Sequence, residues 1–179
     1  MKIIFCDNSL KETFNFRGDI IDHFLKNGNS IVLIAPNNLQ KGKQIKESVK
    51  LYSPKLERSG MNPIKDFIYM MQLLKIYWQE NPDIIFHYTI KPNIYGSIAA
   101  KICGIPSVAM VTGLGYAFFH RGLKTKIARI LYKVSMKFPE KIFVLNEENM
   151  YSLVHMNIIT KEKTVLLSGG EGINLEIFK

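Results

Sequence analysis

Short apolar runs alternate with helix-like segments along the whole chain. Seven runs are rich in β-branched and aromatic residues, which is typical of buried strands. They span residues 2–6, 31–35, 48–52, 83–86, 106–111, 141–145 and 164–167. Apolar residues recur at helical spacing between them, over residues 17–27, 62–79, 92–103, 123–138 and 147–155. This alternation predicts an α/β fold with a doubly wound parallel sheet of six to seven strands, in three layers α/β/α.

The longest predicted helix starts with Asn62 as N-cap and Pro63 in its first turn. We expect its inward stripe to consist of Ile64, Phe67, Ile68, Met71, Leu74 and Trp78. The other side is also apolar, with Tyr69, Met70, Leu73, Ile76 and Tyr77. A helix with so little polar surface is expected to be covered by more protein or to lie against another apolar surface.

The composition is that of one globular domain with a sizeable core. The chain has 179 residues, of which 47% are hydrophobic and 22% charged, and this balance excludes a disordered chain. Cys6 and Cys103 lie in apolar stretches and are interpreted as buried thiols in a reducing cytoplasm. The apolar start before Asp7 is too short for a signal peptide, so we expect a cytoplasmic protein.

Positive charge is concentrated in one segment. Lys and Arg exceed Asp and Glu by 24 to 15, and residues 119–141 hold +6 of the net charge of +9. The predicted helix within this segment carries Lys126, Arg129, Lys133 and Lys137 at helical spacing. Such an excess favours an anionic partner: nucleic acid, phospholipid headgroups or a phosphorylated substrate. A nucleic-acid-binding module remains an alternative, but aromatic and basic residues do not interleave as single-strand binders require.

Polar residues and glycines follow the fourth and fifth predicted strands. In a parallel sheet the crevice beyond the carboxyl ends of the strands binds ligands, so we expect these residues to border a site. They are His87, Lys91, Thr112, Gly113, Gly115 and Tyr116. His87 is the one candidate for a catalytic base, since imidazole titrates near neutrality, and a histidine held at a strand end for structural reasons is the alternative. The two glycines either admit a phosphate or sugar to backbone N–H groups or only shape a turn.

The sequence does not match a dinucleotide-binding domain. The G-x-G-x-x-G fingerprint belongs in the turn after the first strand, where here no glycine occurs before Gly18. A partial match at Gly113 and Gly115 has Phe118 in place of the third glycine and follows a different strand. We therefore expect no NAD, FAD or other cofactor, and no metal site.

Four fragments resemble, in order, the amino-terminal half of glycosyltransferase family 4. They read GNSIVLIAP (with Arg17 before it), PDIIFHYTIKPNIYGSIAAKICGIPSVAMVTGLGYAF, KIFVLNEENMYSL and KTVLLSGGEGINLEIF. The nearest branch contains bacterial enzymes of capsule, O-antigen and lipid-linked oligosaccharide synthesis. The resemblance implies a GT-B architecture, in which two Rossmann-like domains face each other across a cleft. It assigns residues 1–168 to the acceptor-binding domain and residues 169–179 to the start of a linker toward a donor-binding domain that this sequence lacks.

The resemblance also implies a function. It predicts a hexosyltransferase-type enzyme that uses a nucleotide-sugar, expected to be a UDP-sugar, and a lipid-linked or polysaccharide acceptor, with this half inactive alone. Other branches carry a histidine where this chain has Thr112 and Gly113, so no histidine role transfers to that loop. The basic helix is expected to face an anionic cytoplasmic membrane, as in a peripheral protein, or simply solvent. Half of a GT-B-like sugar-nucleotide epimerase is the alternative enzyme.

Overall fold

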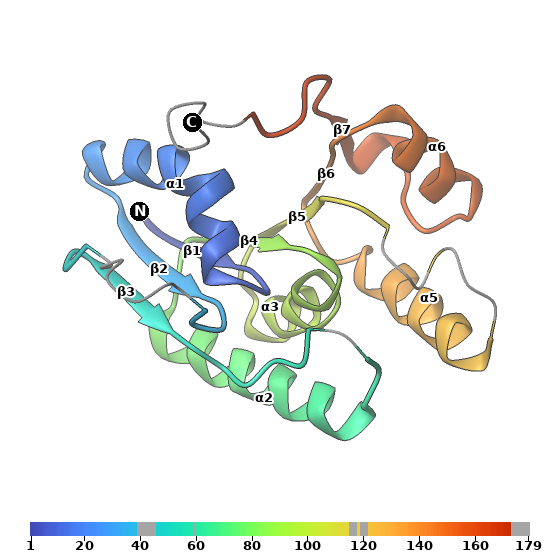
Figure 1. Cartoon of the computed structure of the whole chain (residues 1–179), viewed down its shortest axis with the longest axis horizontal. Coiled ribbons are helices and arrows are strands. Elements are labelled where there is room, and N and C mark those ends of the chain that lie inside the picture. Colours follow the sequence, from blue (N-terminus) through green and yellow to red (C-terminus); the bar gives the residue numbers. More distant parts are fainter. Residues whose placement is uncertain (39–45, 59, 115–117, 119–121, 173–179) are drawn as a thin grey trace.

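The computed structural model describes residues 1–38, 46–58, 60–114, 118 and 122–172. Seven parallel strands form one sheet in the order β3-β2-β1-β4-β5-β6-β7 (Figure 1). The strands are β1 (Lys2–Cys6), β2 (Ser30–Ile34), β3 (Val49–Tyr52), β4 (Ile84–Tyr88), β5 (Ser107–Val111), β6 (Lys141–Val144) and β7 (Thr164–Leu166). The predicted α/β Rossmann-like sheet is confirmed.

Helices cover both faces of the sheet. They are α1 (Leu10–Lys26), α2 (Pro63–Glu80), the π-helical turn η1 (Pro92–Gly96), α3 (Ser97–Cys103), α5 (Leu123–Ser135), α6 (Glu147–His155) and the short η2 (Lys161–Lys163). Side chains alternate along each strand, so Ile3 and Phe5 pack with α1 while Ile4 and Cys6 pack with α2 and α3. Helices α5 and α6 cover β5 and β6 on the α2 side.

The strand order reverses beside β1. The chain runs outward from β1 to β2 and β3, and then returns through α2 to place β4 on the other side of β1. Loops that leave β1 and β4 therefore diverge to opposite faces of the sheet. This divergence opens a crevice at the carboxyl ends of the two strands, which is the usual ligand position in such sheets.

Helix α1 begins seven residues earlier than the sequence pattern predicts. Ser9 is its N-cap, and its hydroxyl accepts a hydrogen bond from the Glu12 N–H at 3.2 Å. The first two turns carry Leu10 and Phe14 four residues apart, and both side chains pack in the core on the α1 side of the sheet. The Ser9 cap and these core contacts together set the boundary.

The predicted inward stripe of α2 is wrong except for Leu74, which is partly buried and packs against the core. Ile64, Phe67, Ile68, Met71 and Trp78 are exposed, whereas the opposite side is buried in the core through Tyr69, Leu73, Ile76 and Tyr77. Both sides are apolar, so hydrophobic spacing could not distinguish them. The buried side also carries Asp66 and Glu80, whose carboxylates bind side chains of neighbouring elements, including Lys91 and Tyr52.

Helix α5 presents apolar residues to solvent. Its sheet-facing side contains Ala128 and Tyr132, which are buried. Its exposed side carries Leu123, Ile127, Ile130 and Val134 at intervals of four, three and four residues. None of the described helices combines the length and apolarity needed to cross a bilayer.

Candidate functional site

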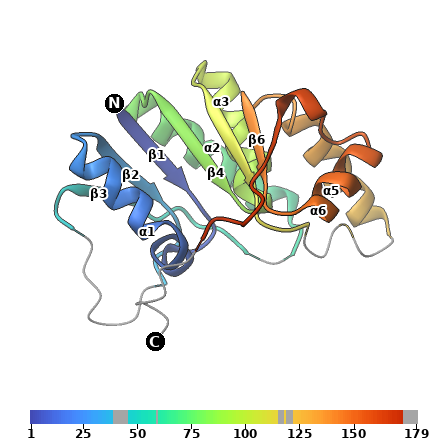
Figure 2. The ribbon, with the colours of Figure 1, turned by 90° about the horizontal axis from the view of Figure 1, so that it is seen from above.

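A cavity of about 760 Å³ opens at the carboxyl ends of β1, β4 and β5. Its walls come from the loops after these strands, from the start of α2 and η1, and from α5. The lining residues are Asn8, Leu56, Arg58, Gly60, Met61, Asp66, Thr89, Ile90, Lys91, Ile94, Tyr95, Thr112, Gly113, Thr125, Ala128 and Leu131. In Figure 2, β1 runs from the N-terminus toward this edge of the sheet. The cavity thus lies beside the point where the strand order reverses.

Three of the predicted site residues meet in this cavity: Lys91, Thr112 and Gly113. Thr112 and Gly113 directly follow β5, as expected. Gly115 and Tyr116 lie outside the described residues. Asn8 and Thr89 also line the cavity and were not predicted, although each is a polar residue that closely follows a predicted strand.

Lys91 is paired within the protein. Its ammonium lies 2.6 Å from Asp66 Oδ1, and the two side chains are only 11% and 8% exposed. Tyr95 donates a hydrogen bond to the other carboxylate oxygen of Asp66 at 3.1 Å. This cluster joins the start of α2 to η1, so the cavity wall is held by a nearly buried ion pair and Lys91 contributes little uncompensated charge.

The expectation that His87 borders the crevice is wrong. His87 lies within β4 and its side chain is fully buried beneath α2 and α3. It shares hydrogen bonds with the Tyr77 hydroxyl at 2.9 Å and with Ser97 Oγ at 3.5 Å. Burial lowers the pKa of the imidazole to about 3, because the charged form cannot be solvated there. His87 is a neutral core residue, and the alternation of side chains along β4 decides which way it points.

The four basic residues predicted for a membrane surface do not share one environment. Lys126, Lys133 and Lys137 are exposed. Arg129 is partly buried and donates a hydrogen bond to the Phe118 carbonyl at 2.7 Å. Lys126 and Lys133 therefore lie on α5 with its exposed apolar stripe, Lys137 follows the end of the helix, and Arg129 binds backbone.

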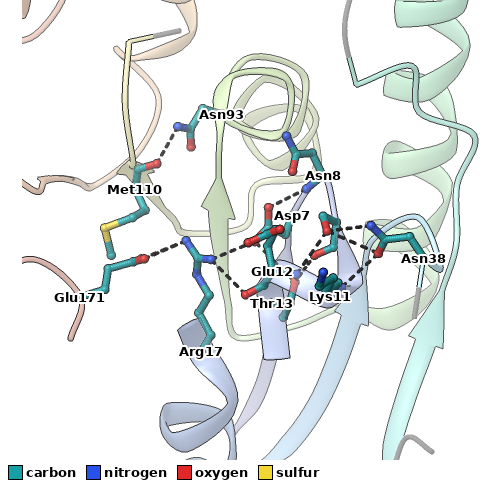
Figure 3. A network of polar contacts seen from close by, with 11 residues as sticks. Asp7, Asn8, Lys11, Glu12, Thr13, Arg17, Asn38, Asn93, Met110 and Glu171 are labelled. Carbon is teal, nitrogen blue, oxygen red and sulfur yellow. Dashed lines mark hydrogen bonds and ion pairs between the residues drawn. The ribbon is translucent and has the colours of Figure 1, made fainter. Parts of the chain in front are cut away.

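A second polar cluster lies on the α1 side of the same edge (Figure 3). Arg17 Nη2 lies 2.9 Å from Glu171 Oε2, and Nη1 lies 3.5 Å from Asp7 Oδ2. The guanidinium also stacks on the Tyr88 ring, 4.3 Å from its centroid. Burial raises the pKa of the Asp7 and Glu171 carboxyl groups, although the positive charge of Arg17 lowers the pKa of each in part. The cluster ties the segment after β7 to α1 and to the end of β1.

Solved structures with the same fold include several enzymes of sugar metabolism. The UDP-GlcNAc 2-epimerase of Methanocaldococcus jannaschii aligns with a TM-score of 0.66 and 18% identity, over 94% of this chain and 46% of that one. MurG of Acinetobacter baumannii aligns with a TM-score of 0.61 and 11% identity, over 97% of this chain and 46% of that one. The lipopolysaccharide outer core galactosyltransferase WaaB aligns with a TM-score of 0.61 and 12% identity, over 92% of this chain and 44% of that one. These are GT-B enzymes, and identities this low show the shared fold alone.

Sequence comparison identifies the family more specifically than structural comparison does. One relative is the N,N'-diacetylbacillosaminyl-diphospho-undecaprenol alpha-1,3-N-acetylgalactosaminyltransferase of Campylobacter jejuni, 29% identical over 186 residues, covering 99% of this chain and 48% of the relative. The chain thus spans about half the length of the proteins it matches. The family described as Glycosyl transferase 4-like matches residues 2–146. With its single parallel sheet and a match over most of its length, the chain belongs to the glycosyl transferase 4-like family.

Proposed function

We propose that residues 1–168 form the acceptor-binding domain of a glycosyltransferase in surface glycan synthesis. The donor is a nucleotide-sugar, a UDP-sugar, and it is bound by a second domain to which residues 169–179 lead. The acceptor is a lipid-linked sugar or a growing glycan. The relative from Campylobacter jejuni supports a lipid-linked acceptor, because its name gives a sugar joined to undecaprenol through a diphosphate.

The observation that carries this proposal is the lining of the large cavity. Apolar side chains of Leu56, Met61, Ile90, Ile94 and Leu131 form much of the wall. The exposed Arg58 and the paired Lys91 and Asp66 add one net positive charge. A cavity that is mostly apolar, with a few polar groups and a cationic edge, fits a ligand that combines hydrocarbon, diphosphate and sugar. Thr112 and Gly113 line the same cavity, so we propose that they contact the acceptor.

Binding measurements on the chain test this function. We expect calorimetric titration to show binding of farnesyl-diphosphate-linked N-acetylglucosamine, a short soluble analogue of a lipid-linked sugar, and no turnover of UDP-sugars by this chain alone. Arg58→Gln is expected to weaken binding about tenfold, because a charge-assisted contact to phosphate is lost. Tight binding of a UDP-sugar without binding of the lipid-linked analogue would instead favour the epimerase-type alternative.

The surface of α5 supports a peripheral membrane association. The helix carries Lys126 and Lys133 along with its exposed stripe, Leu123, Ile127, Ile130 and Val134, and Lys137 follows its end. An amphipathic helix with apolar residues flanked by lysines lies in the plane of an anionic bilayer, where each lysine contributes on the order of 1 kcal/mol. The start of α2 also carries exposed Ile64, Phe67 and Ile68, next to Asp66, which lines the cavity. This arrangement would let a lipid-linked acceptor enter the cavity from the membrane surface.

A further inference from the structure

Three buried polar atoms in the described part of the chain have no hydrogen-bond partner: Arg17 Nε, Thr89 Oγ1 and Asn93 Oδ1. All three adjoin the end of β4. Arg17 stacks on Tyr88, Thr89 follows Tyr88, and Asn93 binds the carbonyl of Met110, which pairs with Tyr88 in the sheet. Buried polar groups in native proteins almost always have hydrogen-bond partners. Three unpartnered atoms at one strand end therefore indicate a bound ligand or an ordered water.

Thr89 and Asn93 form the part of this cluster next to the cavity. Thr89 lines the cavity, and its carbonyl accepts the Asn93 N–H at 3.0 Å. Asn93, four residues further along the chain, is fully buried and is not itself among the residues that line the cavity. The two unpartnered atoms therefore belong to one turn, which begins at the cavity with Thr89 and leads into the π-helical segment η1.

The backbone of Thr89 is strained. Its φ is +67°, a left-handed conformation that a β-branched residue rarely adopts. Glycine or asparagine would fit this position more easily. Backbone strain of this kind is concentrated at active sites and ligand-binding sites, where the function of the residue requires the strained conformation. The π-helical turn that follows is another feature found frequently at functional sites.

The chemistry of Asn93 defines what can bind. Its amide nitrogen donates to the Met110 carbonyl at 2.9 Å and to the Tyr132 hydroxyl at 3.4 Å, so both amide protons are used (Figure 3 shows the first contact). A flipped amide would place two oxygens against each other at Met110, which fixes the assignment. The remaining Oδ1 only accepts, so its partner must donate a proton. A phosphate group cannot do this at neutral pH, whereas a sugar hydroxyl, an acetamido N–H or an ordered water can.

We propose that Thr89 and Asn93 form a hydroxyl-recognition subsite that binds the sugar of the acceptor rather than its diphosphate. This inference rests on the proposed acceptor function and names the part of the cavity that determines sugar specificity. A sugar hydroxyl at Thr89, directly or through one ordered water that also reaches Asn93, completes the hydrogen bonding of both residues. The cationic edge at Arg58 then takes the phosphates.

The test compares two probes on the whole chain: farnesyl-diphosphate-linked N-acetylglucosamine and farnesyl diphosphate, which lacks the sugar. We expect the unaltered chain to bind the sugar-bearing probe at least tenfold more tightly. Thr89→Val and Thr89→Gly should abolish this preference without changing the affinity for farnesyl diphosphate. Thr89→Ser keeps the hydroxyl and should retain the preference for the sugar-bearing probe. Thr164→Val, on strand β7, should retain this preference as well.

The glycine variant separates recognition from a structural role. Thr89→Gly should raise the thermal unfolding midpoint, because it relieves the left-handed strain, while the preference for the sugar is lost. If the sugar preference of the unaltered chain survives in both Thr89→Val and Thr89→Gly, the unpartnered atoms hold only structural water and the subsite is disproved. If the unaltered chain binds neither probe, the acceptor function itself fails and this inference with it. Equal affinity of the unaltered chain for both probes leaves the acceptor function standing but overturns the subsite.

Discussion

Gly96 lies directly against the imidazole ring of His87: a Cβ on Gly96 would lie 2.6 Å from His87 Nε2 and 3.1 Å from the Tyr77 hydroxyl. This contact brings the helix after β4 against its own strand. It also encloses the histidine between η1 and α2, where His87 and Tyr77 share their hydrogen bond. The wall of the cavity that carries Lys91 and Tyr95 rests on this contact.

Gly96→Ala should destabilise the chain, because neither the buried imidazole nor the tyrosine hydroxyl has room to move. Overpacking of this kind costs about 1–3 kcal/mol. Gly18→Ala in α1 is the matched control, since a Cβ at Gly18 would meet nothing within 4 Å. The control should be neutral or stabilising by about 0.5–1 kcal/mol, as alanine favours helix. Urea unfolding of both variants gives the comparison, and equal stabilities would contradict this packing.

His87 should make the protein less stable in mild acid. The pKa of the folded imidazole is about 3, against an ordinary value of 6.5. Between these pH values the unfolded chain binds a proton that the folded chain excludes. The free energy of unfolding therefore falls by about 1.4 kcal/mol for each pH unit of acidification, and it levels off below pH 3. Above pH 6.5 the residue adds no pH dependence.

His87→Gln isolates this contribution, because glutamine can still hydrogen-bond Tyr77 but does not titrate. Urea unfolding at pH 7.5, 6.0 and 5.0 should show a smaller loss of stability in the variant than in the unaltered chain. Parallel losses in the two proteins would mean that His87 is protonated in the folded state.

Arg17 should be essential for stability. Its side chain is 5% exposed and lies between two carboxylates, so Arg17→Met leaves Asp7 and Glu171 buried without a counter-charge. Breaking a buried ion pair on one side typically costs about 3–5 kcal/mol. The loss should become smaller as the pH falls, because burial raises the pKa of both carboxyl groups and so favours their neutral forms.

Lys46→Met is the control for Arg17→Met. The Lys46–Asp22 pair is short, at 2.6 Å, but its side chains are 59% and 41% exposed. Exposed pairs contribute less than about 1 kcal/mol, so this variant should unfold at nearly the same urea concentration as the unaltered chain. A comparable loss in both variants would show that burial is not the deciding factor.

The exposed face of α5 should bind anionic vesicles in a salt-dependent manner. Replacing both Ile127 and Ile130 by serine should weaken binding at least tenfold, because each isoleucine buries apolar surface worth about 1 kcal/mol or more in the interface. Ile102→Ser at the end of α3, which removes an even more exposed isoleucine from another helix, serves as the control. Sedimentation with phosphatidylglycerol and phosphatidylcholine vesicles measures the effect. Absent binding, or binding that salt does not reduce, would contradict the membrane proposal.

The strands were the most predictable part of the fold. Each of the seven was found in the sequence within two residues, because a buried strand of a parallel sheet is a short, continuous apolar run that ends abruptly. Helix α6 was predicted with its observed bounds, and the N-cap of α2 at Asn62 was predicted from its capping residue. Local chemistry suffices for these features, since neighbours in the chain decide them.

The sequence by itself therefore determined the sheet, its helices and the residues that follow the strand ends. Only the tertiary structure decided which side of α2 is buried, because both sides are apolar and their burial depends on α3 and the sheet. It also decided that His87 belongs to the core while Thr112 belongs to the cavity, since the pleat of β4 turns the imidazole beneath α2. The pairing of Lys91 with Asp66, and the unpartnered atoms of Thr89 and Asn93, arise from contacts between segments far apart in the chain, which local patterns do not encode.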